Sequence, residues 1–199
     1  MVEYRLFAGD VPHVSTAAFH ADRERAPHLE QATHRPRLEA AARLIQDAAE
    51  RLPCEDRTVS DLGCGDGGLL SLLWNVGLHY WGYDFQPSNR AGWEERGVRA
   101  FALDVFGADR AAVTLGSISV CTEVLEHLAD PHDAVRWIGG HSRFLVASSP
   151  WNESPESHDE CHAWAWDHDG YRALIEQGGY TVLRHETVGQ FQIILGEKQ

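Results

Sequence analysis

The sequence predicts an α/β fold, in which a doubly wound parallel sheet is finished by an antiparallel hairpin. Five short apolar runs alternate with amphipathic helical stretches between residues 34 and 150. Such alternation is typical of a parallel sheet covered on both faces, because each parallel crossover needs a connection of about helix length. Two further extended runs near the end of the chain are separated only by a short turn, which indicates the hairpin. The 199 residues are read as one domain, a size that buries about 70% of the surface of its unfolded chain.

The N-terminal third begins with a segment that has little periodicity. Residues 1–33 are predicted to be an extension or cap with a short helix, and residues 34–197 to be the core. From His34 onward, Leu, Ile and Ala recur at spacings of three and four, which predicts a helix with Pro36 in its first turn and Pro53 beyond its end.

The remaining elements follow from the same two periodicities. The predicted strands are Thr58–Leu62, His79–Tyr83, Val98–Leu103, Ser117–Cys121 and Phe144–Ala147. The predicted helices are Gly68–Val76, Pro87–Arg96, Pro131–Ile138 and about His168–Gln177, the last ending at Gly178–Gly179. The hairpin is predicted from Tyr180–Glu186 and Gln190–Leu195, with its turn at Thr187–Gly189.

Charge and composition restrict the classes of partner. The formal net charge is −13, and residues 151–170 hold six acids and no Lys or Arg. A nucleic-acid partner is therefore disfavoured, because such binding depends on neutralising phosphates with basic side chains. No apolar run reaches the roughly 18 residues of a membrane span, and the first residues lack a secretory pattern. Four cysteines without a CxxC pair are typical of reduced thiols, so a cytoplasmic location without membrane contact is predicted, and no feature indicates an oligomeric state.

A glycine-rich turn follows the first predicted strand, where residues 61–68 read DLGCGDGG. Closely spaced glycines let a backbone turn tightly and approach a ligand, and the N-terminus of the next helix offers free amide groups. Gly63, Gly65 and Gly68 also satisfy the G-x-G-x-x-G pattern of nicotinamide dehydrogenases. The glycines alone therefore leave open a dinucleotide site, another nucleoside site or a turn without a ligand.

Three carboxylates at strand ends separate these alternatives. Asp61 lies two residues before the first glycine, where it would repel a pyrophosphate and attract an ammonium group. Asp84 ends the second strand, where a carboxylate accepts hydrogen bonds from ribose hydroxyls. Asp104 ends the third strand, in a position to receive an adenine amino group. The ligand that these residues favour has an adenosine, no phosphate and a cationic end, a description that fits S-adenosyl-L-methionine.

Five motifs of the sequence together resemble those of one enzyme family. DLGCGDGG, GYDFQPS, ALDVF, VCTEVLEHLADP and VASSPWN resemble, in order and spacing over about residues 34–197, the motifs of class I S-adenosylmethionine-dependent methyltransferases. The resemblance implies a Rossmann-like, seven-stranded, mostly parallel sheet with an antiparallel last strand, and S-adenosyl-L-methionine as cofactor. The implied cofactor-binding residues are Asp61, Gly63, Cys64, Gly65, Asp84, Phe85, Asp104, Val105 and Thr122. The N-terminal segment of such enzymes often closes over the cofactor, which makes His34 or Arg35 a candidate partner for the methionine carboxylate.

The segment after the fourth strand holds the candidate catalytic groups. Glu123, Glu126 and His127 are spaced to share one surface of a helix expected there, at the end of the sheet where such folds bind ligands. His127 is a candidate general base for a hydroxyl acceptor, since imidazole titrates near pH ~6.5. The alternative is that Glu126 and His127 only order the loop around the cofactor.

A more specific interpretation includes a downstream histidine. Together with His162, Trp164 and Trp166, the Glu123–His127 segment resembles the metal-dependent small-RNA terminal 2′-O-methyltransferases. That resemblance implies magnesium or another divalent ion held by Glu123, Glu126, His127 and His162, acting as a Lewis acid on the acceptor oxygen. The sequence departs from that family at Ala165, where an acid is usual, and lacks a basic surface for RNA.

The predicted function follows from these motifs. Residues 151–168 are predicted to form an active-site lid, in which Trp151, Trp164 and Trp166 either stack on an acceptor or pack on the core. We expect a methyltransferase that acts on the oxygen of a small hydroxylated molecule, such as a sugar, nucleoside or natural product, with Glu123, His127 and His162 as catalytic candidates. An RNA terminal ribose 2′-O-methyltransferase and a non-catalytic cofactor-binding protein remain as alternatives.

Overall fold

The computed structural model describes residues 2–9, 12–73 and 77–199. Its main sheet has seven strands in the order β4-β3-β2-β5-β6-β9-β8. Their bounds are β2 Thr58–Leu62, β3 His79–Tyr83, β4 Ala100–Phe101, β5 Ile118–Thr122, β6 Phe144–Pro150, β8 Tyr180–Val188 and β9 Phe191–Lys198. Strands β2 to β6 pair in parallel, and β9 runs antiparallel to both β6 and β8. The predicted sheet with an antiparallel last strand is therefore confirmed.

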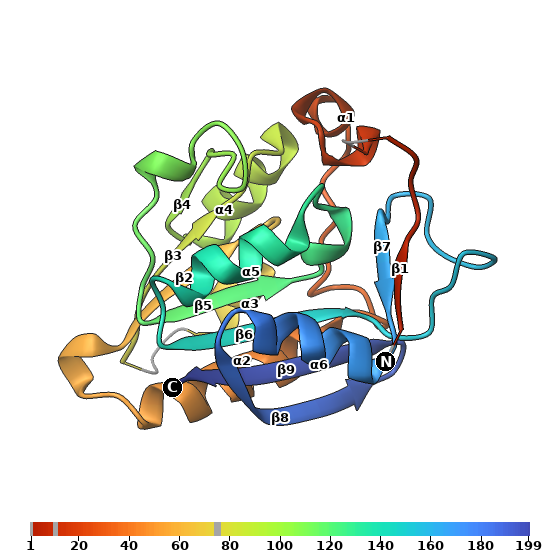
Figure 1. The fold of residues 1–199 in the computed structure, drawn as a ribbon. Helices are drawn as coiled ribbons and strands as arrows, with labels where there is room; N and C mark the ends of the chain where they lie inside the picture. Colours follow the sequence, from red (N-terminus) through yellow and green to blue (C-terminus); the bar gives the residue numbers. More distant parts are fainter. Residues whose placement is uncertain (1, 10–11, 74–76) are drawn as a thin grey trace.

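Helices cover both faces of this sheet, as Figure 1 shows. Helices α2 (Arg35–Glu50), α3 (Gly68–Leu72) and α4 (Arg90–Arg96) pack on one face, and α5 (Pro131–Gly139) and α6 (His168–Gln177) on the other. The apolar stripe predicted for α2 is buried, because Leu38, Leu44 and Ile45 lie in the core between this helix and the sheet. The two core clusters fix the strand ends on which the ligand-binding loops stand.

Several boundaries differ from the predicted ones for reasons of pairing. The predicted strand Val98–Leu103 is reduced to two residues in β4, because this edge strand pairs only with the end of β3. Strand β6 extends to Pro150, since β9 pairs with it along that whole length. The hairpin turn lies at Gly189 and Gln190, since β8 continues to Val188. The turn predicted at Thr187–Gly189 is therefore placed too early in the chain. Gly189 has a φ of +61°, which permits the tighter turn.

Two predicted helices also take another form. Pro87–Arg96 divides into a 3₁₀ turn, η3 (Pro87–Asn89), and α4. The helix expected around Glu123 is wrong: Glu123 lies in a left-handed conformation, and only a 3₁₀ turn, η5 (Leu125–His127), follows it. Helix α3 covers Gly68–Leu72, and residues 74–76 of the predicted helix Gly68–Val76 lie outside the described residues.

The N-terminal segment contains a strand that the sequence did not indicate. Strand β1 (Glu3–Arg5) pairs antiparallel with β7 (Trp164–Trp166) in a separate two-stranded sheet. The chain then forms η1 (His13–Ser15) and the short helix α1 (Ala17–Ala21), which lies near the carboxyl ends of the main strands in Figure 1. We call residues 12–33 the N-terminal strap. Among the residues that the structure describes, none of the helices has the length and apolar character that crossing a bilayer requires.

Candidate functional site

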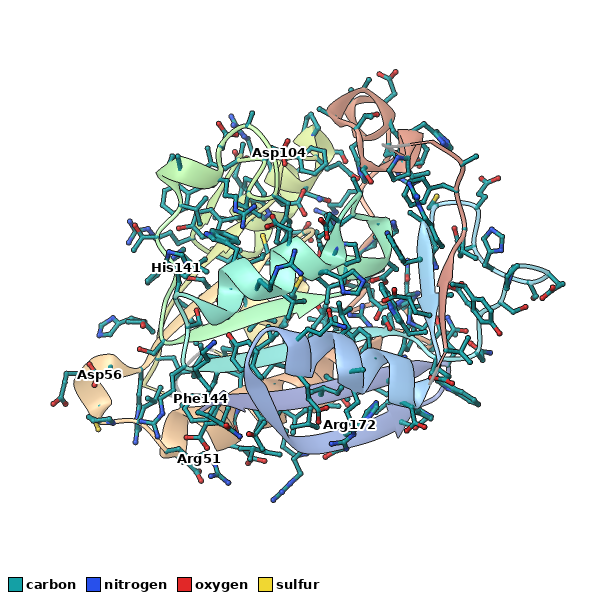
Figure 2. All side chains as sticks on the ribbon, viewed as in Figure 1. Arg51, Asp56, Asp104, His141, Phe144 and Arg172 are labelled. Carbon is teal, nitrogen blue, oxygen red and sulfur yellow. The ribbon has the colours of Figure 1, made fainter. Side chains whose placement is uncertain are left out.

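A cavity of about 460 Å³ opens at the carboxyl ends of β2 to β5. All nine residues predicted to contact the cofactor line it: Asp61, Gly63, Cys64, Gly65, Asp84, Phe85, Asp104, Val105 and Thr122. In Figure 2, Asp104 marks this end of the molecule, and Asp56, just before β2, lies at the far end. The strap contributes Ser15, Phe19 and His20 to the wall. The cavity is thus enclosed by segments that are far apart in the sequence.

The glycine-rich turn is fixed to the end of the neighbouring strand. The backbone amides of Gly63 and Cys64 donate to the carbonyl of Tyr83, and the amide of Gly65 donates to Asp84 Oδ2 at 2.9 Å. Gly63 has a φ of +78°, and a Cβ there would overlap the Val124 side chain. A Cβ on Gly65 would meet no protein atom within 4 Å. Gly63 therefore serves the fold, and Gly65 leaves open space beside the cavity.

Two of the three strand-end carboxylates lie near each other, Asp61 buried and Asp84 partly buried. Asp61 is 1% exposed, and its Oδ1 has no hydrogen-bond partner among the described residues. Burial, followed by the charge of Asp84, raises the pKa of Asp61 to about 7. Asp84 Oδ1 accepts hydrogen bonds from the Gln86 amide and the Asn89 side chain, yet burial still raises its pKa. An incoming cation would favour the ionised form of Asp61.

Arg37 is a cavity residue that the sequence analysis missed. Its side chain is 1% exposed, and its Nε and Nη1 have no hydrogen-bond partner among the described residues. The expected candidates lie elsewhere: Arg35 is exposed and 4.0 Å from Glu39, and His34 stacks on His28 with ring centroids 4.4 Å apart. Arg37 continues the buried face of α2, and an arginine on an apolar stripe was the feature that could have revealed it.

A second group of polar side chains lies beside the cavity. Ligand atoms of Glu126, His127 and His162 all lie within 4.8 Å of one another. Glu126 is fully buried, and neither carboxylate oxygen has a hydrogen-bond partner among the described residues. Burial, together with the charge of Glu123, raises the pKa of Glu126 well above its usual value. We call these three residues the Glu–His–His cluster.

Both imidazoles in this cluster are oriented through Nδ1. His127 Nδ1 lies 2.7 Å from the carbonyl oxygen of Cys161, and His162 Nδ1 lies 2.7 Å from Glu153 Oε2. Since these oxygens can only accept, each Nδ1 carries the hydrogen, and Nε2 is the nitrogen left to bind an ion. Burial, and then the charge of His162, lowers the pKa of His127 to about 3. Burial opposes charge on His162, but its hydrogen bond to Glu153 and the nearby Glu126 raise its pKa to about 9.

Glu123 stands at the border between the cavity and the cluster. It lines the cavity, and its Oε1 accepts a hydrogen bond from Ser148 Oγ at 2.8 Å. Its φ of +56° is unusual for a residue other than glycine. Such strain typically costs about 1–3 kcal/mol and concentrates at functional sites. Glu123 falls outside the group of three, so only three of the four predicted ion ligands are brought together here.

The tryptophans predicted either to stack on an acceptor or to pack on the core have partners within the protein. Trp151 stacks on His168 with ring centroids 5.2 Å apart, and its Nε1 donates to the Gly189 carbonyl. Trp164 Nε1 donates to the Leu128 carbonyl, and Trp166 is fully buried, with Nε1 donating to Glu3. In the described structure these three side chains pack on the protein, and none of them lines the cavity.

Comparison with known proteins identifies the sequence family. A family model described as "Methyltransferase domain" matches residues 32–188, and a search of curated proteins finds no match. The N-terminal domain of EvdMO1, crystallised with SAH and D-fucose, is similar at 18% identity and TM-score 0.64, over 85% of this chain and 86% of that one.

Two other solved structures share the fold at similar levels. Magnesium protoporphyrin IX methyltransferase (ChlM) from Synechocystis PCC 6803 with bound SAH has 12% identity and TM-score 0.64, over 92% of each chain. The methyltransferase domain of bacterial CtHen1 has 17% identity and TM-score 0.61, over 83% of this chain and 99% of that one. At these identities the likeness concerns the fold.

Proposed function

The chain belongs to the class I S-adenosylmethionine-dependent methyltransferases, and from that premise we propose that it methylates an oxygen of a small hydroxylated molecule, such as a sugar or nucleoside. The observation that supports this proposal most is the Glu–His–His cluster, because it places an unpartnered buried carboxylate and two oriented imidazoles beside the cofactor cavity. An acceptor hydroxyl must lose its proton as the methyl group arrives, and such groups can assist either as a base or by holding a Lewis-acidic ion.

The cavity residues fit S-adenosylmethionine by their chemistry. Asp84 would receive the ribose hydroxyls and Asp104 the adenine amino group, and Asp61, with an unpartnered oxygen, would bind the ammonium group. Arg37 would pair with the methionine carboxylate, because its buried guanidinium still has two nitrogens without a partner among the described residues. When bound, the cofactor supplies a methyl group on a sulfonium, whose sulfur keeps the bonding electron pair as S-adenosylhomocysteine leaves. The residues of the chain therefore bind and orient, and the strap excludes water.

The Glu–His–His cluster fits a divalent ion better than it fits a simple general base. The low pKa of His127 keeps its ring neutral near pH 7, as an ion ligand must be, and makes it a weak proton acceptor. His162, whose pKa is about 9, would have to lose its Nε2 proton as an ion binds. Glu126 and the two histidines, with Glu123 on the cavity side, would hold the ion. Magnesium or manganese bound there would act as a Lewis acid on the acceptor oxygen. Proton removal would then rely on solvent, with Glu126 balancing the charge.

A second candidate is methylation of an RNA terminal ribose. The same cluster favours it, because neighbouring ribose hydroxyls suit an ion held by carboxylate and imidazole groups. The net charge of −13 and the exposed acids Glu156, Asp159 and Glu160 near the cluster disfavour a polyanion. We therefore place the small acceptor first.

Methyl transfer to defined acceptors tests the proposal. The purified chain is incubated with S-adenosylmethionine and sugars, nucleosides or short RNA ends, in Mg²⁺, Mn²⁺ or a chelator. We expect ion-dependent transfer to a small acceptor, a loss of at least about 100-fold in Glu126→Gln with unchanged affinity for S-adenosylhomocysteine, and full activity in Glu156→Gln. Transfer to RNA alone would select the second candidate. Tight binding of S-adenosylhomocysteine without transfer to any acceptor would indicate a non-catalytic cofactor-binding protein.

A further inference from the structure

Glu153 is a mostly buried acid in a loop whose other acids are exposed. It belongs to residues 151–163, which connect β6 to β7 and which we call the β6–β7 loop. Its side chain is 13% exposed, and that of its partner His162 is 11% exposed. By contrast, Glu156, Asp159 and Glu160 in the same loop are exposed. A carboxylate that is withdrawn from water in this way needs partners inside the protein.

Each oxygen of Glu153 has one such partner. Oε1 accepts the backbone N–H of Asp159 at 2.9 Å, and Oε2 accepts the Nδ1–H of His162 at 2.7 Å. The second bond fixes which His162 nitrogen carries the hydrogen and how the ring is turned. It leaves Nε2 as the ion-binding nitrogen. A carboxylate behind a ligating histidine is a recurrent arrangement at protein metal sites, because it orients the ring and makes it more basic.

The end of the β6–β7 loop also touches the other two members of the cluster. The Cys161 carbonyl accepts from His127 Nδ1, and the amide of Ala163 donates to the Glu126 carbonyl at 2.7 Å. Residues 161–163 therefore supply His162 and contact both Glu126 and His127. Glu153, near the start of the loop, bonds His162 near its end.

We propose that Glu153 is the positioning residue for His162, and that through it the ordering of the β6–β7 loop is coupled to the binding of a divalent ion. This inference rests on the ion site of the proposed function. It adds that the loop and the ion stabilise each other: an ordered loop presents His162 correctly, and an ion on His162 holds the loop in place.

Asp159, in the same loop, provides a matched control that distinguishes the positioning role of Glu153 from a purely structural one. Asp159 Oδ1 accepts the backbone N–H of Cys161 at 2.8 Å, so Asp159 also braces this loop, but no hydrogen bond joins its carboxylate to the His162 ring. Loosening of the loop, with the His162 Nδ1 bond kept, is reproduced by Asp159→Ala. Loss of the His162 orientation is reproduced only by changing Glu153.

Ion affinity, measured without any turnover, tests the inference. Mn²⁺ and Co²⁺ are titrated calorimetrically into the unchanged chain and into Glu153→Ala, Glu153→Gln, Asp159→Ala and Glu126→Gln, and the visible absorption of the Co²⁺ complex is recorded. We expect Glu153→Ala to weaken ion binding by about 10–100-fold and to alter the Co²⁺ spectrum. Glu153→Gln should recover part of the affinity, since its amide oxygen still accepts from Nδ1–H. Asp159→Ala should keep both the affinity and the spectrum of the unchanged chain.

The other outcomes distinguish failure of the Glu153 role from failure of the proposed ion site. If Glu126→Gln loses ion binding while Glu153→Ala binds the ion as tightly as the unchanged chain does, the ion site stands. Only the positioning role of Glu153 is then overturned. An equal loss in Glu153→Ala and Asp159→Ala also overturns it, because ordering of the loop then explains the effect. If the unchanged chain binds neither ion, both the ion site and this inference fail. Unchanged affinity for S-adenosylhomocysteine in every variant shows that the fold is intact.

Discussion

Buried ionisable side chains without partners are the residues from which the site is built. Asp61, Arg37 and Glu126 each keep at least one polar atom free of any hydrogen bond among the described residues. Leaving such a group unsatisfied costs about 1–3 kcal/mol or more, so a fold retains it where a ligand completes it. The order of motifs along the strands was enough to predict Asp61 and Glu126. Arg37 was missed, although its position on the apolar stripe of α2 could have revealed it. The role of Glu153 could not be predicted, because its bond to His162 depends on how the β6–β7 loop folds.

The raised pKa of Asp61 leads to a prediction on ligand affinity. At pH 5 and 6 this carboxyl is protonated in the free protein, because burial and Asp84 raise its pKa to about 7. An ammonium group favours the ionised form, so binding must release this proton. We expect affinity for S-adenosylhomocysteine to fall by up to about tenfold per unit below pH 7, as measured by calorimetry, and this dependence to flatten in Asp61→Asn.

The same group has a predictable effect on folding stability. Its pKa in the folded chain is above the ordinary value of 3.8, so its contribution is fully present below about pH 4 and is lost as the pH rises through 7. Asp61→Asn should therefore raise the thermal unfolding temperature at pH 8 more than at pH 5. An affinity for S-adenosylhomocysteine that is independent of pH would contradict the assignment of Asp61.

At the scale of elements, the sequence pattern predicted the bounds of those strands and helices whose ends are set by neighbouring residues in the chain. Strands β2 and β3 and helix α6 have the predicted bounds, because each has strong periodicity and a clear end such as a glycine pair. The length of β4, the position of the hairpin turn and the pairing of β1 with β7 depend on a partner strand. Such pairing is a property of the assembled sheet and is not encoded within a window of a few residues.

The glycine-rich turn allows fold and binding to be separated by two matched substitutions. Both Gly63 and Gly65 have positive φ, so an alanine at either position costs about 1–2 kcal/mol. Only at position 63 would the added Cβ overlap Val124. We expect Gly63→Ala to lower the unfolding temperature clearly more than Gly65→Ala does. Gly65→Ala should instead weaken S-adenosylhomocysteine binding about tenfold or more. Equal effects of the two variants in thermal unfolding and calorimetry would argue against this division of roles.

At the scale of the whole molecule, an ion network holds the N-terminal strap against the glycine-rich turn. Arg96 Nη2 lies 2.8 Å from both Asp66 Oδ2 and Glu30 Oε1, and Arg25 Nε lies 3.9 Å from Asp66 Oδ2. The side chains of Asp66 and Arg96 are 4% and 11% exposed, so this pair is mostly withdrawn from solvent. Through it, a strap that supplies part of the cavity wall is tied to the glycine-rich turn that also lines the cavity.

Breaking this network should both destabilise the fold and open the cavity. Arg96→Ala leaves the buried Asp66 with the Gly68 amide and, as its charged partner, the more distant Arg25, and we expect the unfolding temperature to fall by about 5–10 °C. S-adenosylhomocysteine should also dissociate several-fold faster, as measured by stopped-flow fluorescence. The exposed Arg90, on the same helix, provides the control, because Arg90→Ala should change neither quantity. A strap that matters only to the fold would change the unfolding temperature and leave the dissociation rate as it was.

The strap and the β6–β7 loop are also joined directly. Arg23 Nη1 of the strap donates to Cys161 Sγ of the loop at 3.0 Å. Ser15 Oγ of the strap donates to the carbonyl of His127, whose ring in turn bonds the Cys161 carbonyl of the loop. Because each segment rests on the other, neither can swing aside without breaking these links. We therefore expect an obligatory sequence of arrivals and departures, in which the nucleoside enters first, the acceptor follows, and the methylated product is released while the spent nucleoside is still enclosed.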